Sequence, residues 1–330
     1  MYQILPPATA HHPSTPRLPG QRGRTAPQAH GERPTGRVAG ELVHLRAPES
    51  VLLTGWTRHD AERFTLTALW PEADGGDPAT GGPRPDTRLV AQTVRQSGLL
   101  IAHAEFDVPL AHQTLLEQLD FTVDPGFRVP ADRPAEMDVE VVCREAGRRG
   151  RVLTGLDIDV AVRHHGRLVA RSETRFSWIS PAVYRRLRGE RAVVSGWGQW
   201  PLPGPVEPEL AGRATAPEIV LAPTARPHRW ELRCDPTHTA LFDHPVDHVP
   251  GLVLVEAACQ AAHGRTSGLF TPSSVATVFT RYVEFDAPCW IEAETVPTDT
   301  PGTVTVRVTG SQDGQPAFES TLTGPIAEVR

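Results

Sequence analysis

The segment DHPVDHVPGLVLVEAACQAAHG, residues 243–264, contains the side chains best suited to acid–base chemistry in this chain. His244 and His248 each follow an aspartate and precede a Pro-Gly turn. Histidine changes its charge near neutral pH, so it is the usual proton-transfer group of enzymes. The H-x-x-x-H spacing also suits zinc, but no third ligand stands at a suitable distance along the chain, and we expect no metal site. The pattern favours two catalytic or substrate-binding histidines.

Glu256 is the single carboxylate in the apolar run that follows this turn. A run with almost no polar face predicts a buried helix. Burying an unpaired carboxylate costs free energy and tends to raise its pKa, which is how a general acid or base is made. The alternative is that Glu256 is satisfied by backbone N–H groups or by an arginine.

The start of this predicted helix offers hydrogen-bond donors. Gly251 has no side chain, so the backbone can approach a ligand closely. The first N–H groups of a helix, here those of Gly251 and Leu252, have no partner within the helix and favour an anion. The oxyanion formed from a thioester is one ligand that such a position stabilises.

A second predicted helix lies earlier in the chain, within residues 86–106. Asp86 or Thr87 is its expected N-cap, and it should run for about four turns. Aligning VAQTVRQSG with LVEAACQAA places three polar positions opposite one another, namely Gln92 with Glu256, Arg95 with Cys259, and Gln96 with Gln260. Alternating strands follow both helices, with hairpin turns at 165–166 and 313–314. This repeat predicts an internal duplication.

Each copy therefore reads as one buried helix followed by a long antiparallel sheet, which is the hotdog arrangement. The expected fold class is α+β, a double hotdog in which the two copies form a pseudo-dimer. The expected ranges are a disordered segment over 1–38, a first hotdog domain over 39–182, a Pro/Gly-rich linker or covering segment over 183–226, and a second hotdog domain over 227–330.

Composition excludes several functions. The net charge of −6 includes no basic block of the kind that binds nucleic acid. The chain contains no lysine, so lysine-imine chemistry is excluded and any anionic substrate must bind arginine, histidine or backbone N–H groups. The four cysteines form no C-x-x-C pair, which argues against a zinc or disulfide framework. No apolar run approaches the roughly 18 residues of a membrane span, so we expect a cytoplasmic protein without membrane contact.

Several segments resemble the A-factor biosynthesis family, the gamma-butyrolactone synthases of actinomycetes. These proteins have tandem hotdog domains related to the hotdog 3-hydroxyacyl-carrier-protein dehydratases. The segments are VLLTGW (51–56), LVAQTVRQSGLLIAH (89–103), VPLAHQ (108–113) and DHPVDHVPGLVLVEAACQAA (243–262). The resemblance implies transfer of a 3-oxoacyl group from an acyl carrier protein or CoA thioester to dihydroxyacetone phosphate. The product leads to a signal that controls antibiotic biosynthesis, and no cofactor is implied.

The sequence departs from the family pattern, which has Glu and Arg three positions apart on both helices. Here the first helix has Gln92 and Arg95, and the second has Glu256 and Cys259. In hotdog dimers the histidine and the acidic residue of one site come from opposite subunits. By that rule, His244 faces Gln92, and Glu256 faces a loop of the first copy that lacks histidine.

The resemblance and the chemistry together suggest roles for nine residues. His244 is the base, and Glu256 is either catalytic in a second half-site or a structural anchor. Gln92 and Gln96 orient the thioester or the attacking hydroxyl, and Arg95 binds the phosphate of the acceptor unless it forms a structural ion pair. The other expected substrate-binding residues are His248, Gly251, Leu252 and Gln260.

Two other functional classes fit the same sequence. One is a thioesterase, dehydratase or cyclase that acts on a carrier-bound polyketide. A dehydratase is disfavoured, because Gln92 does not exchange protons at neutral pH. The other is a non-catalytic pseudo-dimer that binds an acyl group or a small ligand. Assembly of two such chains into a homodimer is compatible with either class.

Overall fold

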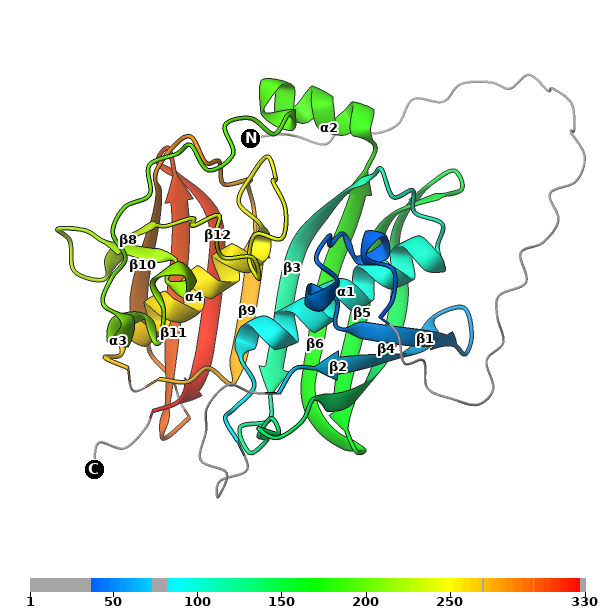
Figure 1. The fold of residues 1–330 in the computed structure, drawn as a ribbon, viewed down its shortest axis with the longest axis horizontal. Helices are drawn as coiled ribbons and strands as arrows, with labels where there is room; N and C mark the ends of the chain where they lie inside the picture. The colour runs from blue at the N-terminus through cyan, green and yellow to red at the C-terminus, as the bar shows by residue number, and fades with distance from the viewer. Residues whose placement is uncertain (1–36, 73–81, 269, 299, 327–330) are drawn as a thin grey trace, which may run out of the picture. The chain divides into compact units, whose positions relative to one another are not determined.

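The computed structural model describes residues 37–72, 82–268, 270–298 and 300–326 (Figure 1). Nearly all of the segment 1–38, for which the sequence predicts disorder, lies outside these ranges. Most of the histidine-free loop before the first predicted helix, residues 73–81, also lies outside them.

Both predicted helices are present. Helix α1 spans Thr87–Ala104, and Asp86 caps it by accepting a hydrogen bond from the Arg88 N–H. With 18 residues, α1 is about one turn longer than predicted. Helix α4 spans Gly251–Arg265, and Pro250 at its N-cap supplies no side-chain cap. Residues 253–262 of α4 are all buried, as its apolar sequence requires.

The strands of the two halves follow the same order along the chain (Figure 1). The first half contains β1 (Leu53–Arg58), β2 (Arg63–Trp70), β3 (Gln113–Val123), β4 (Ala135–Arg149), β5 (Val152–His164) and β6 (Arg167–Ile179). The second half contains β7 (Leu221–Pro223), β8 (Arg229–Leu232), β9 (Ser274–Phe279), β10 (Cys289–Val296), β11 (Thr303–Gln312) and β12 (Gln315–Pro325). Along the chain, the long helix of each half follows the second strand and precedes the third.

Within the described residues, the strands form one antiparallel sheet in the order β1-β2-β4-β5-β6-β3-β9-β12-β11-β10-β8-β7. The second half repeats the order of the first in reverse, as a two-fold relationship between the halves requires. Strands β3 and β9 join the halves, with Asp120 paired to Ala276. The predicted duplication and the double hotdog are therefore confirmed.

Alternating side chains of the strands form the core. On β2, Phe64, Leu66, Ala68 and Trp70 are buried while their neighbours are more exposed. Helix α1 approaches β6 closely at Gly98, where an added Cβ would lie 2.4 Å from the ring of Phe176. The side chains of the sheet and the helices together make one continuous apolar cluster.

The Pro/Gly-rich segment between the halves contains several short elements. These are α2 (Pro181–Arg188), the 3-10 turn η4 (Gly189–Ala192), α3 (Pro208–Ala211) and the 3-10 turn η5 (Ala216–Glu218). In the first half, the 3-10 turns η1 (Gly40–Val43) and η2 (Pro48–Ser50) precede β1 as α3 and η5 precede β7. The segment thus covers α4 as residues 40–50 cover α1. No helix in the described residues is long and apolar enough to cross a membrane.

Candidate active site

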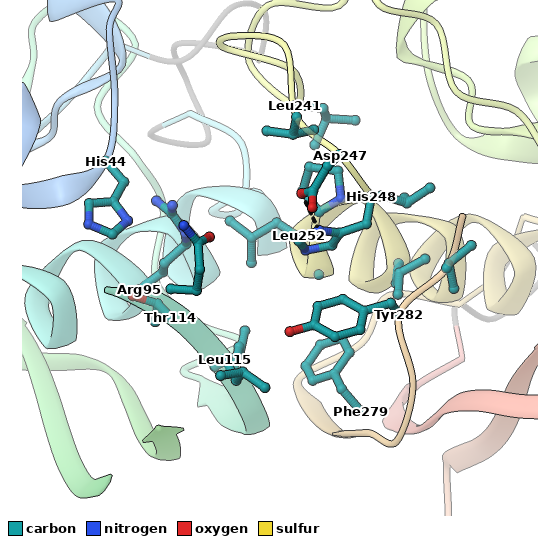
Figure 2. Close-up of a pocket in the computed structure, with 18 of the residues that line it drawn as sticks. His44, Arg95, Thr114, Leu115, Leu241, Asp247, His248, Leu252, Phe279 and Tyr282 are labelled. Carbon is teal, nitrogen blue, oxygen red and sulfur yellow. Dashed lines mark hydrogen bonds and ion pairs between the residues drawn. The ribbon is translucent and has the colours of Figure 1, made fainter. Parts of the chain in front are cut away.

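A cavity of about 380 Å³ lies between α1 and the N-terminus of α4, and both halves of the chain line it (Figure 2). Its wall brings together six of the nine residues that the sequence suggests, namely Gln92, Arg95, His244, His248, Gly251 and Leu252. The expected crossing of the halves is therefore present, because the histidine loop of the second half faces the helix of the first. The other three residues, Gln96, Glu256 and Gln260, do not line this cavity.

His244 forms a dyad with the aspartate beside it. Its ring Nδ1 lies 2.9 Å from Asp243 Oδ2, so Nδ1 donates and Nε2 is left with a lone pair. The same carboxylate accepts hydrogen bonds from the N–H groups of Arg46 at 2.6 Å and Ala47 at 2.8 Å. Burial raises the pKa of Asp243, but the hydrogen bonds from Arg46 N–H, His244 and Ala47 N–H outweigh it and lower the pKa overall. Asp243 therefore stays charged and ties the two halves together at the site.

His248 forms a second dyad with the same geometry. Its Nδ1 lies 2.8 Å from Asp247 Oδ1, and the Tyr184 hydroxyl donates to the other oxygen of Asp247. Burial raises the pKa of Asp247, but hydrogen bonds from His248 and Tyr184 outweigh it, and the pKa is lowered overall. The ring of Tyr282 packs edge-on against His248 at 4.6 Å between centroids (Figure 2). Both histidines are thus held with Nδ1 toward a carboxylate.

The N-terminus of α4 is open to the cavity. The N–H groups of Gly251 and Leu252 have no hydrogen-bond acceptor among the described residues, and both residues line the cavity. The N-terminus of α1 differs, because Asp86 caps it. Of these two helices, only α4 therefore offers the partial positive charge of its N-terminus to a ligand.

Gln92 and Arg95 face the cavity from α1 with unused polar groups. Gln92 Oε1 is buried and has no hydrogen-bond partner in the described part of the chain. Arg95 is partly buried, and its guanidinium donates one hydrogen bond, of 3.2 Å, to Val43 O. In the described ranges no carboxylate oxygen lies within 4.0 Å of it, so it forms no structural ion pair. Burial lowers the pKa of Arg95 to about 10, so the side chain is still protonated at neutral pH.

His44 also lines the cavity, beside Arg95 (Figure 2), and the sequence analysis missed it. His103 Nδ1 lies 2.7 Å from Val108 O, so Nδ1 donates and His103 Nε2 accepts. His44 Nε2 lies 2.9 Å from His103 Nε2 and must therefore donate, which leaves His44 Nδ1 as an acceptor. Burial and the nearby Arg95, His103 and His244 lower the pKa of His44 to about 3, so it is neutral. A pairing across 59 residues leaves no periodic signal in the sequence.

The remaining wall of the cavity is largely apolar. Leu116 and Phe176 of the first half and Leu254 and Phe279 of the second half contribute to it. An apolar wall of this kind accommodates an acyl chain, with the polar groups gathered around the histidines.

Glu256 lies outside the cavity, fully buried, and its charge is paired. Arg213 holds it at two points, with Nε 2.6 Å from Oε1 and Nη2 2.8 Å from Oε2. Gln260 Nε2 donates to Oε1 at 2.5 Å, and Arg88 Nε lies 3.8 Å from Oε2. Of the two alternatives that the sequence left open, the geometry matches the carboxylate satisfied by an arginine.

Arg213 supplies the cation that α4 lacks. Cys259 stands where the alignment expects an arginine, and its thiol is buried. Burial raises the pKa of Cys259 to about 12, so the thiol is unreactive at neutral pH. The arginine comes instead from the segment before β7, where sequence alignment of the two helices does not reach.

Gln96 and Gln260 both bond to backbone groups, and Gln260 also donates to Glu256. Gln96 accepts from Leu52 N–H at 2.8 Å and donates to Ser50 O at 2.9 Å. Gln260 accepts from Val220 N–H at 3.0 Å and donates to Glu218 O at 2.8 Å. The two glutamines therefore occupy equivalent places, each fastening a helix to the segment before the first strand of its half. Their substrate-binding roles, expected from the sequence, have no support in this geometry. In the described ranges, no group of three or more His, Cys, Asp or Glu residues is arranged to hold a metal ion.

The family model for the A-factor biosynthesis hotdog domain, AfsA, matches residues 26–180 and 199–327. The chain belongs to the AfsA family. Three AfsA relatives, each named 2-oxo-3-(phosphooxy)propyl 3-oxoalkanoate synthase, align along most of their length. The protein of Streptomyces virginiae is 44% identical over 285 residues, which cover 86% of this chain and 96% of the relative. Those of Streptomyces coelicolor and Streptomyces griseus are each 39% identical and cover 86% and 87% of this chain, and 90% and 95% of the relative.

A solved structure, the 12:0-ACP thioesterase from Umbellularia californica, has the same fold as this AfsA chain. It gives a TM-score of 0.50 at 13% identity and covers 82% of this chain and 99% of its own. At this identity the likeness concerns the fold alone. The resemblance to the A-factor family that the sequence motifs indicate is thereby confirmed, as is the hotdog fold.

Proposed function

We propose that this chain is a 2-oxo-3-(phosphooxy)propyl 3-oxoalkanoate synthase. The name describes an ester between a 3-oxo acid and the hydroxyl of dihydroxyacetone phosphate, so the enzyme is an acyltransferase. The relatives that carry this name match most of the chain. The observation that carries the proposal is a single cavity that joins a His–Asp dyad, an uncapped helix N-terminus and an arginine without a carboxylate partner among the described residues.

The acceptor binds with its phosphate on Arg95. A guanidinium with several free donors suits phosphate, and at this depth a bound anion also balances the buried positive charge. His44 is neutral and adds no further charge beside Arg95. The 3-oxoacyl chain lies along the apolar wall, with its thioester carbonyl directed at the start of α4.

The reaction begins at the hydroxyl of dihydroxyacetone phosphate. His244 Nε2 removes its proton while the hydroxyl oxygen bonds to the thioester carbonyl carbon. The carbonyl oxygen becomes an oxyanion and is stabilised by the N–H groups of Gly251 and Leu252. Its collapse breaks the C–S bond, and the proton on His244 passes to the departing thiolate sulfur. The base is thereby regenerated, and the products are the phosphorylated ester and the free thiol.

Gln92 and His248 assist by binding. The unpaired Oε1 of Gln92 accepts an N–H of the thioester arm, which removes the cost of a buried acceptor without a partner. His248 Nε2 contacts the substrate from the side of the cavity lined by Tyr282. The thioester itself is delivered by an acyl carrier protein or by CoA, since both present the acyl group on the same type of flexible arm.

The test is a product assay by mass spectrometry. The purified protein receives a 3-oxoacyl thioester with and without dihydroxyacetone phosphate. We expect the phosphorylated ester only when the acceptor is present. Free 3-oxo acid in equal amounts with and without the acceptor would instead identify a thioesterase, and no turnover of any thioester would identify a binding protein. Either result would overturn the proposal.

A further inference from the structure

Helix α2 connects the two halves and packs against the wall of the cavity with one face. Tyr184 on this face donates to Asp247, and its ring meets that of Tyr282 at 6.1 Å between centroids. Arg188, one turn later, forms an ion pair with Glu284 and donates to Asp247 O at 3.2 Å. Its guanidinium also lies 4.2 Å from the centre of the Tyr282 ring. This face therefore fixes α2 directly behind the His248–Asp247 dyad.

The opposite face of α2 is basic and exposed. Arg185 and Arg186 are exposed and have no hydrogen bond or ion pair among the described residues. Leu187 is 62% exposed, and Val193, shortly after the helix, is 66% exposed. Residues 181–194 contain four arginines and one glutamate, in a chain whose net charge is −6. Arg188 and Arg191 pair with Glu284 and Asp286, so Arg185 and Arg186 supply the unpaired positive charge of this segment.

Arg281 extends this basic region to the cavity itself. It precedes Tyr282, is exposed, and lines the cavity. Across the part of the chain that the structure describes, its guanidinium has no carboxylate partner; its backbone N–H bonds to Ala317 O at 3.1 Å. We refer to Arg185, Arg186, Leu187, Val193 and Arg281 as the α2 surface.

Such a combination is typical of a docking site. Protein interfaces are enriched in arginine, and exposed apolar surface often marks them. Unpaired arginines attract an acidic partner and speed its association. An acidic partner also suits this chain better than a second copy of itself, whose matching surface would be equally basic.

We propose that the α2 surface docks an acidic acyl carrier protein, so that its thioester arm enters the cavity past Arg281. This proposal rests on the function proposed above, and it assigns the surface on which the carrier protein binds. A carrier protein offers a whole face to this surface, whereas CoA offers a single nucleotide and buries little of the apolar side chains. A short thioester without phosphate needs none of these contacts.

The experiment compares three donors of one 3-oxoacyl group: the acyl carrier protein, CoA and N-acetylcysteamine. The double variant Arg185→Glu/Arg186→Glu should raise the KM for the carrier-protein donor by about tenfold or more, which corresponds to about 1.4 kcal/mol. Its KM for the other two donors and its kcat should change less than about twofold, because rim charges act mainly on association. The matched control is the double variant Arg149→Glu/Arg151→Glu, at the exposed end of β4 and the turn before β5. It should leave the KM for all three donors unchanged.

Direct binding of the carrier protein, measured by calorimetry, separates this proposal from the proposed function. If the wild-type protein forms no ester from any donor, the function fails, whereas loss of carrier binding in the double variant still supports docking. An unchanged KM and unchanged binding of the carrier protein would overturn the docking proposal. So would a double variant that alters only the sedimentation of the chain, since the surface would then be a contact between two copies.

Discussion

Arg213 and Glu256 form a two-point ion pair outside the cavity, with Nε 2.6 Å from Oε1 and Nη2 2.8 Å from Oε2. Glu256 occupies the helix position that Gln92 has in the other half. Arg213 pairs with Glu256, whereas Gln92 Oε1 has no hydrogen-bond partner among the described residues. The two halves therefore differ at equivalent positions, because Gln92 lines the cavity and Glu256 forms an internal ion pair.

Breaking this pair should destabilise the protein strongly. Arg213→Ala leaves the fully buried Glu256 with Arg88 as its nearest cation, at 3.8 Å. We expect a loss of about 3 kcal/mol in the free energy of unfolding, measured with urea, because an uncompensated buried charge is costly. The double variant Arg213→Met/Glu256→Met should recover most of the lost free energy of unfolding, because no buried charge is then left unpaired. A large loss of kcat in Arg213→Ala without a loss of stability would contradict the structural role.

Replacing Gln96 or Gln260 should affect stability more than substrate binding. Gln260→Leu removes the partners of Val220 N–H and Glu218 O. Gln96→Leu removes those of Leu52 N–H and Ser50 O. Buried groups without partners cost about 1–3 kcal/mol each. The free energy of unfolding should therefore fall, while the KM values stay close to those of the wild type. A raised KM with unchanged stability would return these glutamines to the substrate-binding set.

Arg95→Gln should weaken recognition of the acceptor phosphate. Hydrogen bonds to a charged group contribute about 1.5–3 kcal/mol, so we expect the KM for dihydroxyacetone phosphate to rise by about 10–150-fold. The same assay with unphosphorylated dihydroxyacetone is the control, because its KM should hardly change. Equal losses with both acceptors would show that Arg95 maintains the cavity and does not bind the phosphate.

His244→Asn should act on the chemical step. General base catalysis contributes typically 10²–10⁴-fold, so kcat for ester formation should fall within about that range while the KM for the acceptor changes little. His165→Asn, in the exposed turn between β5 and β6, provides the control and should retain wild-type activity. A variant His244→Asn with unchanged kcat would move the role of base to His248.

Acid should destabilise the protein through Asp243. Its folded pKa is lowered, because the hydrogen bonds from Arg46 N–H, His244 and Ala47 N–H outweigh the effect of burial. A lowered folded pKa contributes stability above the unfolded value of about 3.9, and this contribution is lost as the pH falls through the folded pKa. Urea unfolding of Asp243→Asn should therefore depend less on pH below about 4 than that of the wild type. Parallel pH dependences would contradict the assigned hydrogen bonds.

Local patterns in the sequence were sufficient for the elements and for most of the cavity. The apolar run of α4, the capping residue Asp86 and the turn at Asp313 and Gly314 each act over a few residues, so they predict helices and hairpins directly. That His244 faces Gln92 came from the resemblance to hotdog dimers, applied to the aligned helices, and both residues line the cavity.

Contacts between distant segments were not predictable in this way. Arg213 stands 43 residues before Glu256, in a segment whose composition indicates only a linker or cover. His44 likewise meets His103 through the packing of residues 40–50 on α1. In both cases the segment before the first strand of a half supplies the side chain, and neither periodicity nor spacing records which residue points at the helix.

The connection of the two halves in one polypeptide has a consequence for how the two helices can differ. In a homodimer one gene specifies both subunits, so a substitution on the central helix changes both sites at once. Joining the copies in one polypeptide, through the segment between β6 and β7, removes that constraint. Each copy of the helix can then change without altering the other, and in this chain Gln92 and Glu256 stand in different surroundings.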